Sequence, residues 1–346
     1  MKILLPYIDL NNHSINHPQV TGGSELFCRH LVNNFDTYIP QIPIEALNYN
    51  LKEKNAIVQR IIEEAITFDV DIIVSNFSGS IFAGHEITTK SPIPLMVIEH
   101  CIYPMLTVIA KWNNVVNRGH SVFFVSKAQE MRYQKMADRS EQSLYTTGHY
   151  IRPSYCHGEK SAIQDVEYDC MTIGRSYKGK DPFKLHRFLK DTDLRRLVIS
   201  SRTDYDDQAY YEKNKHWDHT IWDQPYDVVM DTLGKAATYF STCEYETWGI
   251  TALEALSHGV PIILSSDKDI PHASEVIVAS PRHYRRIPKG SASELIQGIQ
   301  ENDLDRQEVQ DMTWEKHSEK AWRENFETAA QMTIDKFNKH HNSLFG

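Results

Sequence analysis

The chain has 346 residues, of which 41% are hydrophobic and 24% charged, and this length and composition predict a globular protein of two domains. The 46 acidic residues outnumber the 37 lysines and arginines, and the formal net charge of -9 excludes a surface that is basic all round, although it permits a local basic patch. Five cysteines without a C-x-x-C pair exclude a fully paired disulfide framework and favour free thiols in a reducing compartment. No apolar run approaches membrane-spanning length, and the apolar start is too short for a signal peptide, so we expect a cytoplasmic protein.

Short apolar runs alternate with longer amphipathic stretches from the N-terminus onward. The first run, Ile3–Ile8, precedes a helical stretch at Ser24–Phe35, and isoleucines at helical spacing predict a second helix over Glu53–Thr67. Eight runs are continuous and followed by polar turns, which predicts parallel strands covered on both faces. They are Ile3–Ile8, Ile72–Asn76, Leu95–Glu99, Val122–Ser126, Cys170–Ile173, Leu197–Ser200, Thr238–Ser241 and Pro261–Ser265. Further helices are expected at Asp227–Leu233 and Thr251–Ser257.

The stretch Ile151–Asp165 interrupts this alternation with proline, glycine and polar residues, and it therefore predicts a linker between two domains. We expect an N-terminal domain over residues 1–155, a C-terminal domain over residues 166–320 and a helical tail over residues 321–346 that packs back on the body. The regular alternation of strands and helices predicts a doubly wound α/β architecture in each domain.

The most informative segment is Glu246–Glu254, in which seven residues separate two glutamates. Gly249 permits a tight turn at the start of a helix, and the free N–H groups of the first turn, at Ile250 and Thr251, form a site suited to a phosphate. A glutamate before the turn can accept hydrogen bonds from hydroxyls next to that phosphate. A glutamate further along the helix can accept them from a second diol, such as a ribose.

This pattern, continued by a helix that ends at Gly259 before Pro261, resembles the signature of glycosyltransferase family 4. The resemblance implies a retaining transferase of the GT-B type, with two Rossmann-like domains, a cleft between them and a C-terminal helix that packs back. It also implies that Glu246 holds the donor sugar and Glu254 the nucleotide ribose. The other donor-binding residues that it implies in this segment are Trp248, Gly249, Ile250 and Thr251.

Two cations follow the first strand of the second domain, in Gly174-Arg175-Ser176-Tyr177-Lys178-Gly179. Cations at a strand end can neutralise a diphosphate and the charge of its leaving group. The family has an Arg and a Lys here, which implies catalytic roles for Arg175 and Lys178. The spacer is shorter than in the family, so Lys180 is the alternative to Lys178.

Two motifs of the first domain extend the resemblance. Gly22 and Gly23 precede a helix and permit a close approach of the backbone to a ligand, and the family has a similar loop that faces the donor phosphates. His100 follows the strand Leu95–Glu99, and ligands of such sheets bind at the carboxyl ends of strands. The resemblance implies that His100 is catalytic, near the reacting sugar.

The chemistry implied needs a nucleotide-sugar donor, UDP-linked by expectation, but no metal ion and no other cofactor. No carboxylate of the motif is placed as a covalent nucleophile, so we expect a front-face reaction in which the departing phosphate takes the acceptor proton. We interpret the D-x-D triplets as turns and helix caps; among them are Asp69–Asp71, Asp204–Asp206 and Asp267–Asp269. In the segment Trp217–Tyr226, either Trp222 or Tyr226 could stack on the nucleotide base, and packing in the core is the alternative.

The sequence is compatible with more than one class of acceptor. Basic residues cluster in Lys111–Arg139, including His120, and in Arg282–Lys289, including His283, and either cluster could meet a polyanion or be a solvated face. The layout is also similar to that of the DNA α-glucosyltransferases of T-even bacteriophages, which makes hydroxymethylcytosine in double-stranded DNA one candidate acceptor and the host cytoplasm the expected compartment. The alternatives are a cell-surface glycan or lipid-linked sugar, or a catalytically silent protein that binds nucleotide sugars or nucleic acid.

Overall fold

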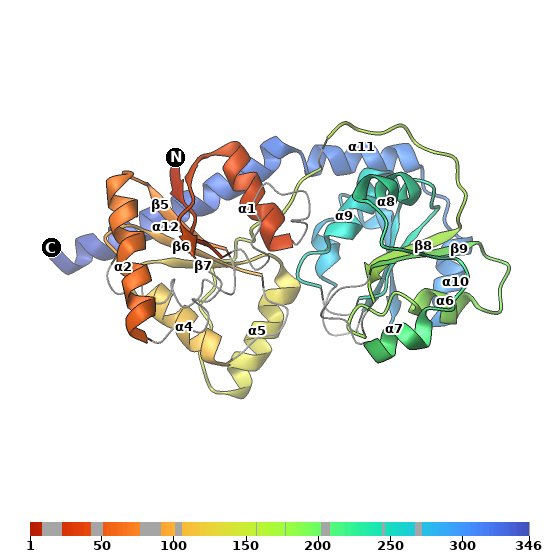
Figure 1. The fold of residues 1–346 in the computed structure, drawn as a ribbon, viewed down its shortest axis with the longest axis horizontal. Helices are drawn as coiled ribbons and strands as arrows, with labels where there is room; N and C mark the ends of the chain where they lie inside the picture. The colour runs from red at the N-terminus through yellow and green to blue at the C-terminus, as the bar shows by residue number, and fades with distance from the viewer. Residues whose placement is uncertain are drawn as a thin grey trace. The chain divides into compact units, whose positions relative to one another are not determined.

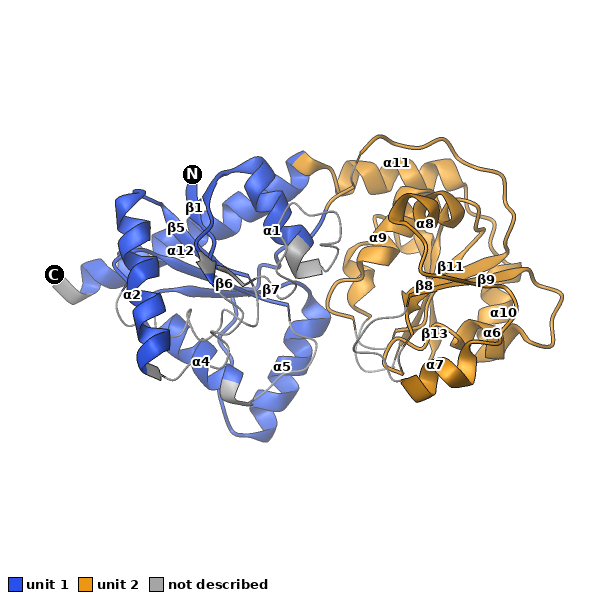
Figure 2. Ribbon diagram, in the orientation of Figure 1, with its two compact units in different colours: residues 1–154, 320–346 blue, residues 155–319 orange. Residues whose placement is uncertain are grey.

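The computed structural model describes residues 1–8, 23–42, 51–76, 91–100, 106–156, 158–176, 178–201, 208–243, 246–266 and 272–345. The chain forms two compact units (Figure 2). Unit 1 consists of residues 1–154 and 320–346, and unit 2 of residues 155–319. Each unit is built around one parallel sheet with helices packed on it (Figure 1), so the predicted α/β architecture with two Rossmann-like domains is confirmed.

Unit 1 has a five-stranded parallel sheet in the order β3-β1-β5-β6-β7. Its strands are β1 (Lys2–Leu4), β3 (Asp36–Tyr38), β5 (Ile72–Ser75), β6 (Leu95–Glu99) and β7 (Ser121–Phe124). The predicted strand Ile3–Ile8 is divided in two, because β2 (Tyr7–Ile8) pairs separately with β4 (Gln41–Ile42). Pro6 lies at the break, and proline has no N–H to donate to a ladder.

The helices of unit 1 are α1 (Gly23–Asn34), α2 (Leu51–Thr67), α4 (Leu106–Asn117), α5 (Lys127–Arg139) and most of α12 (Glu319–Phe345). Apolar side chains of α2, α4 and α5 meet those of the strands in one core, which includes Ile61, Val97 and Trp112. α5 begins at Ser126, whose hydroxyl accepts a hydrogen bond from the backbone N–H of Gln129 at 3.2 Å and so caps the helix.

The C-terminal helix packs back on unit 1, as predicted. Trp322 of α12 is fully buried, lies edge-on to Phe27 of α1 at 5.9 Å between ring centroids, and donates its indole N–H to the carbonyl of Arg152 at 2.8 Å. Further along α12, Lys336 donates to the carbonyl of His120 at 2.6 Å. The helix is amphipathic, and among the described residues no helix is long and apolar enough to cross a membrane.

Unit 2 has a six-stranded parallel sheet in the order β10-β9-β8-β11-β12-β13. Its strands are β8 (Cys170–Arg175), β9 (Arg196–Ser201), β10 (Thr220–Trp222), β11 (Tyr239–Ser241), β12 (Ile262–Ser266) and β13 (Tyr284–Pro288). Its helices are α6 (Lys184–Leu189), α7 (Gln208–Asn214), α8 (Tyr226–Leu233), α9 (Ile250–Ser257), α10 (Ala292–Gln300) and α11 (Arg306–Lys316), with short 3-10 helices at Ala273–Val276 and Pro281–His283. Every predicted strand of this unit is found within one or two residues of its expected bounds.

Candidate active site

The topology of unit 2 marks one place where a ligand is expected. From β8 the chain runs outward to β9 and β10, and it then returns to the other side of β8 to form β11, β12 and β13. The loops that follow β8 and β11 therefore leave two neighbouring strands in opposite directions. Open parallel sheets bind ligands beyond the carboxyl ends of their strands at such a switch point. Arg175 ends β8 here, and Glu246 follows β11 after a short loop.

The loop after β8 brings Lys180 to Glu246. The ammonium group of Lys180 is ion-paired with Oε1 of Glu246, and the two side chains are 20% and 19% exposed. The hydroxyl of Thr242 donates to the carbonyl of Lys180 at 2.7 Å and so fixes its backbone. Lys178, in contrast, is exposed. Of the two lysines considered from the sequence, the structure therefore places Lys180 next to Glu246.

The turn before α9 has the geometry of an anion site. Gly249 is the N-cap residue, with φ of 96° in the left-handed region, and its carbonyl accepts from the N–H groups of Ala252 at 3.0 Å and Leu253 at 3.2 Å. The N–H groups of Ile250 and Thr251 belong to the first turn and have no acceptor within the helix. The helix dipole adds positive potential at this end, so a phosphate would be stabilised here.

A single histidine joins the elements around this turn. The side chain of Ser274 lies against Gly249 and leaves no room for a β-carbon at position 249. His272 accepts the N–H of Ser274 at Nδ1 (3.1 Å) and donates from Nε2 to the carbonyl of Cys243 (2.8 Å). Since Cys243 belongs to the loop after β11, the imidazole ties that loop to the segment that supports the turn.

Glu254, the second glutamate, is held by a tyrosine. The hydroxyl of Tyr226, at the start of α8, donates to Oε1 of Glu254 at 2.8 Å. Burial raises the pKa of the Glu254 carboxyl above its usual range, and the hydrogen bond from Tyr226 opposes that rise. The carboxylate oxygens can accept further hydrogen bonds, as a ribose diol would require.

Two aromatic residues of the segment lie inside unit 2. Trp248 is 3% exposed and its ring lies edge-on to His317 at 6.2 Å, so the indole packs in the interior, and only the backbone of this residue is left to face a ligand. Tyr239 is also buried, and its hydroxyl donates to the carbonyl of Ile173 at 3.5 Å. Desolvation, and then the charge of Glu246 among other groups, raise the pKa of Tyr239 well above its usual range.

Tyr239 was not identified from the sequence. It stands in the apolar run Thr238–Ser241, where an aromatic ring is expected in the core, and nothing in the pattern distinguishes its hydroxyl. In the structure it is a neutral hydroxyl that lies close enough to Glu246 and Glu254 for both to raise its pKa. The side chain of Thr251, in the anion-binding turn, opposes this rise in pKa.

His100 belongs to unit 1, at the carboxyl end of β6. Its Nε2 lies 2.5 Å from Oδ1 of Asn76, which follows the neighbouring strand β5, and its ring lies 5.8 Å from that of Phe27. The amide of Asn76 in turn donates to Cys28 at 3.0 Å. Gly23 is the first residue of α1, and Gly22 lies outside the described residues.

The His100 imidazole is expected to remain neutral at physiological pH. Desolvation lowers its pKa to about 3, whereas an unfolded histidine titrates near about 6.5. The stability linked to this group is therefore fully present above about pH 6.5 and is lost as the pH falls towards about 3. NMR should show no titration of His100 between about pH 5 and pH 8. On acidification, a His100→Gln variant should lose less free energy of unfolding than the unmodified chain. Titration of His100 with an ordinary histidine pKa would contradict the desolvation of its imidazole.

The residues considered for the nucleotide base lie in different surroundings. Trp222 packs against the rings of Phe183 at 5.6 Å and Tyr211 at 5.1 Å, so it contributes to the core of unit 2. Tyr226 is 56% exposed as a residue. Of the two aromatic candidates, Tyr226 is therefore the more exposed one.

The two basic clusters are smaller than the sequence indicates. His120 is buried, accepts the N–H of Leu95 at 3.1 Å and stacks on Phe337, so it is no part of a basic surface. His283 is buried as well. Arg285 is ion-paired with Glu301 at 2.7 Å, which neutralises much of its charge. Exposed cations of the first cluster include Arg118 in the turn after α4 and Lys135 and Arg139 on α5, and those of the second cluster include Arg282, Arg286 and Lys289.

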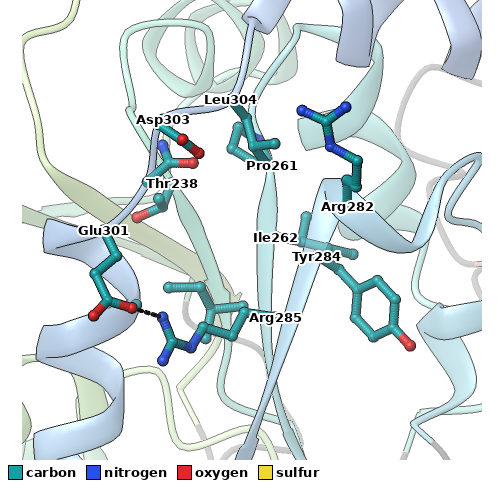
Figure 3. A pocket seen from close by; sticks show the side chains of 12 residues that line it. Thr238, Pro261, Ile262, Arg282, Tyr284, Arg285, Glu301, Asp303 and Leu304 are labelled. Carbon is teal, nitrogen blue, oxygen red and sulfur yellow. Dashed lines mark hydrogen bonds and ion pairs between the residues drawn. The ribbon is translucent and has the colours of Figure 1, made fainter.

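A groove of about 260 Å³ lies in unit 2 at the opposite ends of the strands of the same sheet (Figure 3). It is formed where β11, β12 and β13 begin, between the paired side chains of Arg285 and Glu301 on one side and Arg282 on the other. Because it lies at the amino ends of the strands, it is separate from the switch point at their carboxyl ends. Nowhere in the described part of the chain do three His, Cys, Asp or Glu side chains meet as a metal-binding group.

No protein-family model matches the sequence, and no curated protein matches it significantly. Solved structures do match over nearly the whole chain. A glycosyltransferase from Rickettsia africae is 13% identical with a TM-score of 0.68, and the match covers 96% of this chain and 98% of that one. The lipopolysaccharide outer core galactosyltransferase WaaB is 14% identical with a TM-score of 0.64, with 95% and 99% covered. Anabaena HepE in complex with UDP and glucose is 15% identical with a TM-score of 0.61, and both chains are covered completely.

The chain has the GT-B fold. Similarity at these identities establishes the fold, and the function depends on the chemistry of the site. In the GT-B chain described here, the residues singled out from the sequence in unit 2 lie around one switch point. Lys180 lies next to Glu246, whereas Lys178, the lysine matched to the family pattern, is exposed.

Proposed function

We propose that this protein is a retaining glycosyltransferase that moves a sugar from a nucleoside-diphosphate donor to an acceptor hydroxyl. The observation that carries the proposal is the Lys180–Glu246 ion pair beside the left-handed turn at Gly249, beyond the carboxyl ends of β8 and β11. A cation and free helix N–H groups suit a diphosphate, and a carboxylate beside them suits the hydroxyls of a sugar. The carboxylate of Glu254, which the Tyr226 hydroxyl holds in place, can accept hydrogen bonds from the hydroxyls of a ribose.

The proposed reaction breaks the bond between the anomeric carbon and the diphosphate oxygen. The acceptor oxygen forms the new bond on the same face of the sugar, and its proton passes to the departing phosphate oxygen. The products are a glycoside with the anomeric configuration of the donor and a free nucleoside diphosphate. Arg175, Lys180 and the N–H groups after Gly249 stabilise the negative charge that develops on the leaving group, and a catalytic metal ion forms no part of the proposal.

The donor is proposed to be a UDP-hexose. Support comes from HepE, which has the same fold and is described in complex with UDP-glucose and with UDP and glucose. A panel of UDP-, GDP- and ADP-linked sugars, with release of nucleoside diphosphate as the readout, tests this choice. NMR of the purified product then gives the configuration of the new bond, and an inverted product would remove the retaining mechanism.

Two acceptor classes are supported by different observations. WaaB, which is a lipopolysaccharide galactosyltransferase, has the same fold and favours a glycan acceptor. The exposed cations Arg118, Lys135 and Arg139 of unit 1 favour a polyanion, and hydroxymethylcytosine in double-stranded DNA is then the second candidate. Transfer to hydroxymethylated DNA, plain DNA and oligosaccharides, followed by mass spectrometry, separates the two. Transferred sugar found only on hydroxymethylated bases would identify DNA as the acceptor. Absence of transferred sugar from every nucleoside would exclude DNA.

Two substitutions test the roles of the site residues. Glu254→Ala is expected to raise the Kd for UDP about 10- to 100-fold, because hydrogen bonds to a charged acceptor contribute about 1.5–3 kcal/mol. Arg175→Ala is expected to lower kcat about 100-fold with a smaller effect on UDP binding, because it acts on charge that develops during the reaction. Calorimetry and steady-state kinetics measure the two effects. Full binding and full turnover in both variants would show that the site lies elsewhere.

A further inference from the structure

Tyr226 joins two helices that are distant in the sequence. It is the first residue of α8, and its hydroxyl donates to Oε1 of Glu254 on α9 at 2.8 Å. The residue is 56% exposed, although a large aromatic residue is usually buried when it serves only to pack. The hydroxyl is therefore directed at a partly buried carboxylate while the residue as a whole is exposed.

The surroundings of Glu254 contain several ionisable groups. They are Tyr226 of α8, Tyr239 of β11, Glu246 of the preceding loop and His258, whose Nδ1 lies 2.8 Å from the Glu254 backbone carbonyl. Burial raises the pKa of the Glu254 carboxyl, and the side-chain hydrogen bond from the Tyr226 hydroxyl lowers this pKa. A hydrogen bond to a carboxylate stabilises the charged form, so Tyr226 both orients this group and favours its ionised form.

We propose that Tyr226 is a positioning residue that presents Glu254 to the two hydroxyls of a cis-diol, the ribose of the nucleoside diphosphate. This inference rests on the proposed function. A carboxylate offers about four lone-pair positions. With one position on Oε1 taken by the tyrosine, the rotation of the carboxylate is restricted, and the positions that remain on Oε1 and Oε2 can accept one hydroxyl each.

A consequence is selection for a complete ribose. A 2′-deoxyribose donates one hydroxyl fewer, so it leaves part of the oriented carboxylate without a donor, and a polar group left unpaired in a ligand complex costs affinity. Without the tyrosine hydroxyl the carboxylate can rotate, and this selection is expected to weaken. A purely structural role for Tyr226 would instead change the binding of both nucleotides equally.

The test uses calorimetric titration of UDP and 2′-deoxy-UDP into the full chain, Tyr226→Phe, and a matched control, Tyr284→Phe, which makes the same chemical change at the other edge of the sheet. We expect Tyr226→Phe to weaken UDP binding about tenfold and 2′-deoxy-UDP binding less than about twofold. The variant loses the hydrogen bond that favours the charged carboxylate. As the pH is lowered, its affinity for UDP should therefore begin to fall at a higher pH than the affinity of the unmodified chain. Tyr284→Phe should match the unmodified chain throughout.

The outcomes separate this inference from the proposed function. Equal losses for the two nucleotides in Tyr226→Phe, with an unchanged pH dependence, would show that the hydroxyl does not position Glu254. Unchanged UDP binding in Tyr226→Phe together with a loss in Glu254→Ala would overturn the inference and leave the proposed function standing. Unchanged UDP binding in Glu254→Ala would overturn the inference, and the proposed function would fail with it if Arg175→Ala also kept full turnover.

Discussion

Alanine at Lys180 is expected to lower kcat for sugar transfer about 100- to 1000-fold, whereas alanine at Lys178 should change it less than about threefold. The reason is the difference in their positions. Lys180 is partly buried, ion-paired with Glu246 and fixed through its backbone by Thr242. The ion pair holds Lys180 beyond the strand ends, where it can stabilise leaving-group charge without reorganising, and Lys178 is not held in this pair.

Single-turnover and steady-state kinetics with saturating donor measure this effect, and Lys178→Ala is its matched control, since both variants lose one charge from the same loop. Lys180→Arg keeps the charge but changes its shape, so partial recovery is expected. Thermal unfolding of all variants separates a loss of chemistry from a loss of fold. A large drop in kcat for Lys178→Ala with near-normal turnover in Lys180→Ala would return the role to Lys178.

Most strands that the sequence predicts lie inside their sheets, and β7, which is predicted although it lies at a sheet edge, is buried along its whole length. Strands such as Ile72–Ser75 and Leu95–Glu99 are buried along their whole length, so they form continuous apolar runs. The strands that the sequence does not predict include β3, β10 and β13, which lie at sheet edges and have partly exposed residues. Edge strands need no continuous apolar run, so the pattern that identifies central strands is missing from them.

The site could be predicted where a backbone requirement fixes the residue type. Gly249 must adopt a left-handed conformation, and the motif around it is therefore visible in the sequence. The choice between Lys178 and Lys180 depends on how a loop folds back, and residue spacing does not determine that. Tyr226 and His272 act through contacts with residues 28 and 29 positions away, to Glu254 and Cys243, which only the folded chain reveals.

Alanine at Gly249 is expected to lower the free energy of unfolding by about 2–5 kcal/mol and to abolish measurable binding of UDP. The residue has φ of 96°, which costs a non-glycine residue about 1–3 kcal/mol. A β-carbon there would also collide with the hydroxyl of Ser274, which is fully buried and has little freedom to move. Relief of that collision would shift the first turn of α9 and its N–H groups.

Gly290→Ala is the control for this prediction. Gly290 has φ of 80°, but a β-carbon at this position would meet nothing within 4 Å, so its substitution carries the backbone strain without the collision. Chemical denaturation should show a smaller loss for Gly290→Ala than for Gly249→Ala, with UDP binding retained. Adding Ser274→Ala to Gly249→Ala should recover part of the stability, because it removes the atom that collides and leaves the strain. Equal stability of the two glycine variants would show that Ser274 does not crowd this turn. Retained UDP binding by Gly249→Ala would show that the turn does not hold the phosphate.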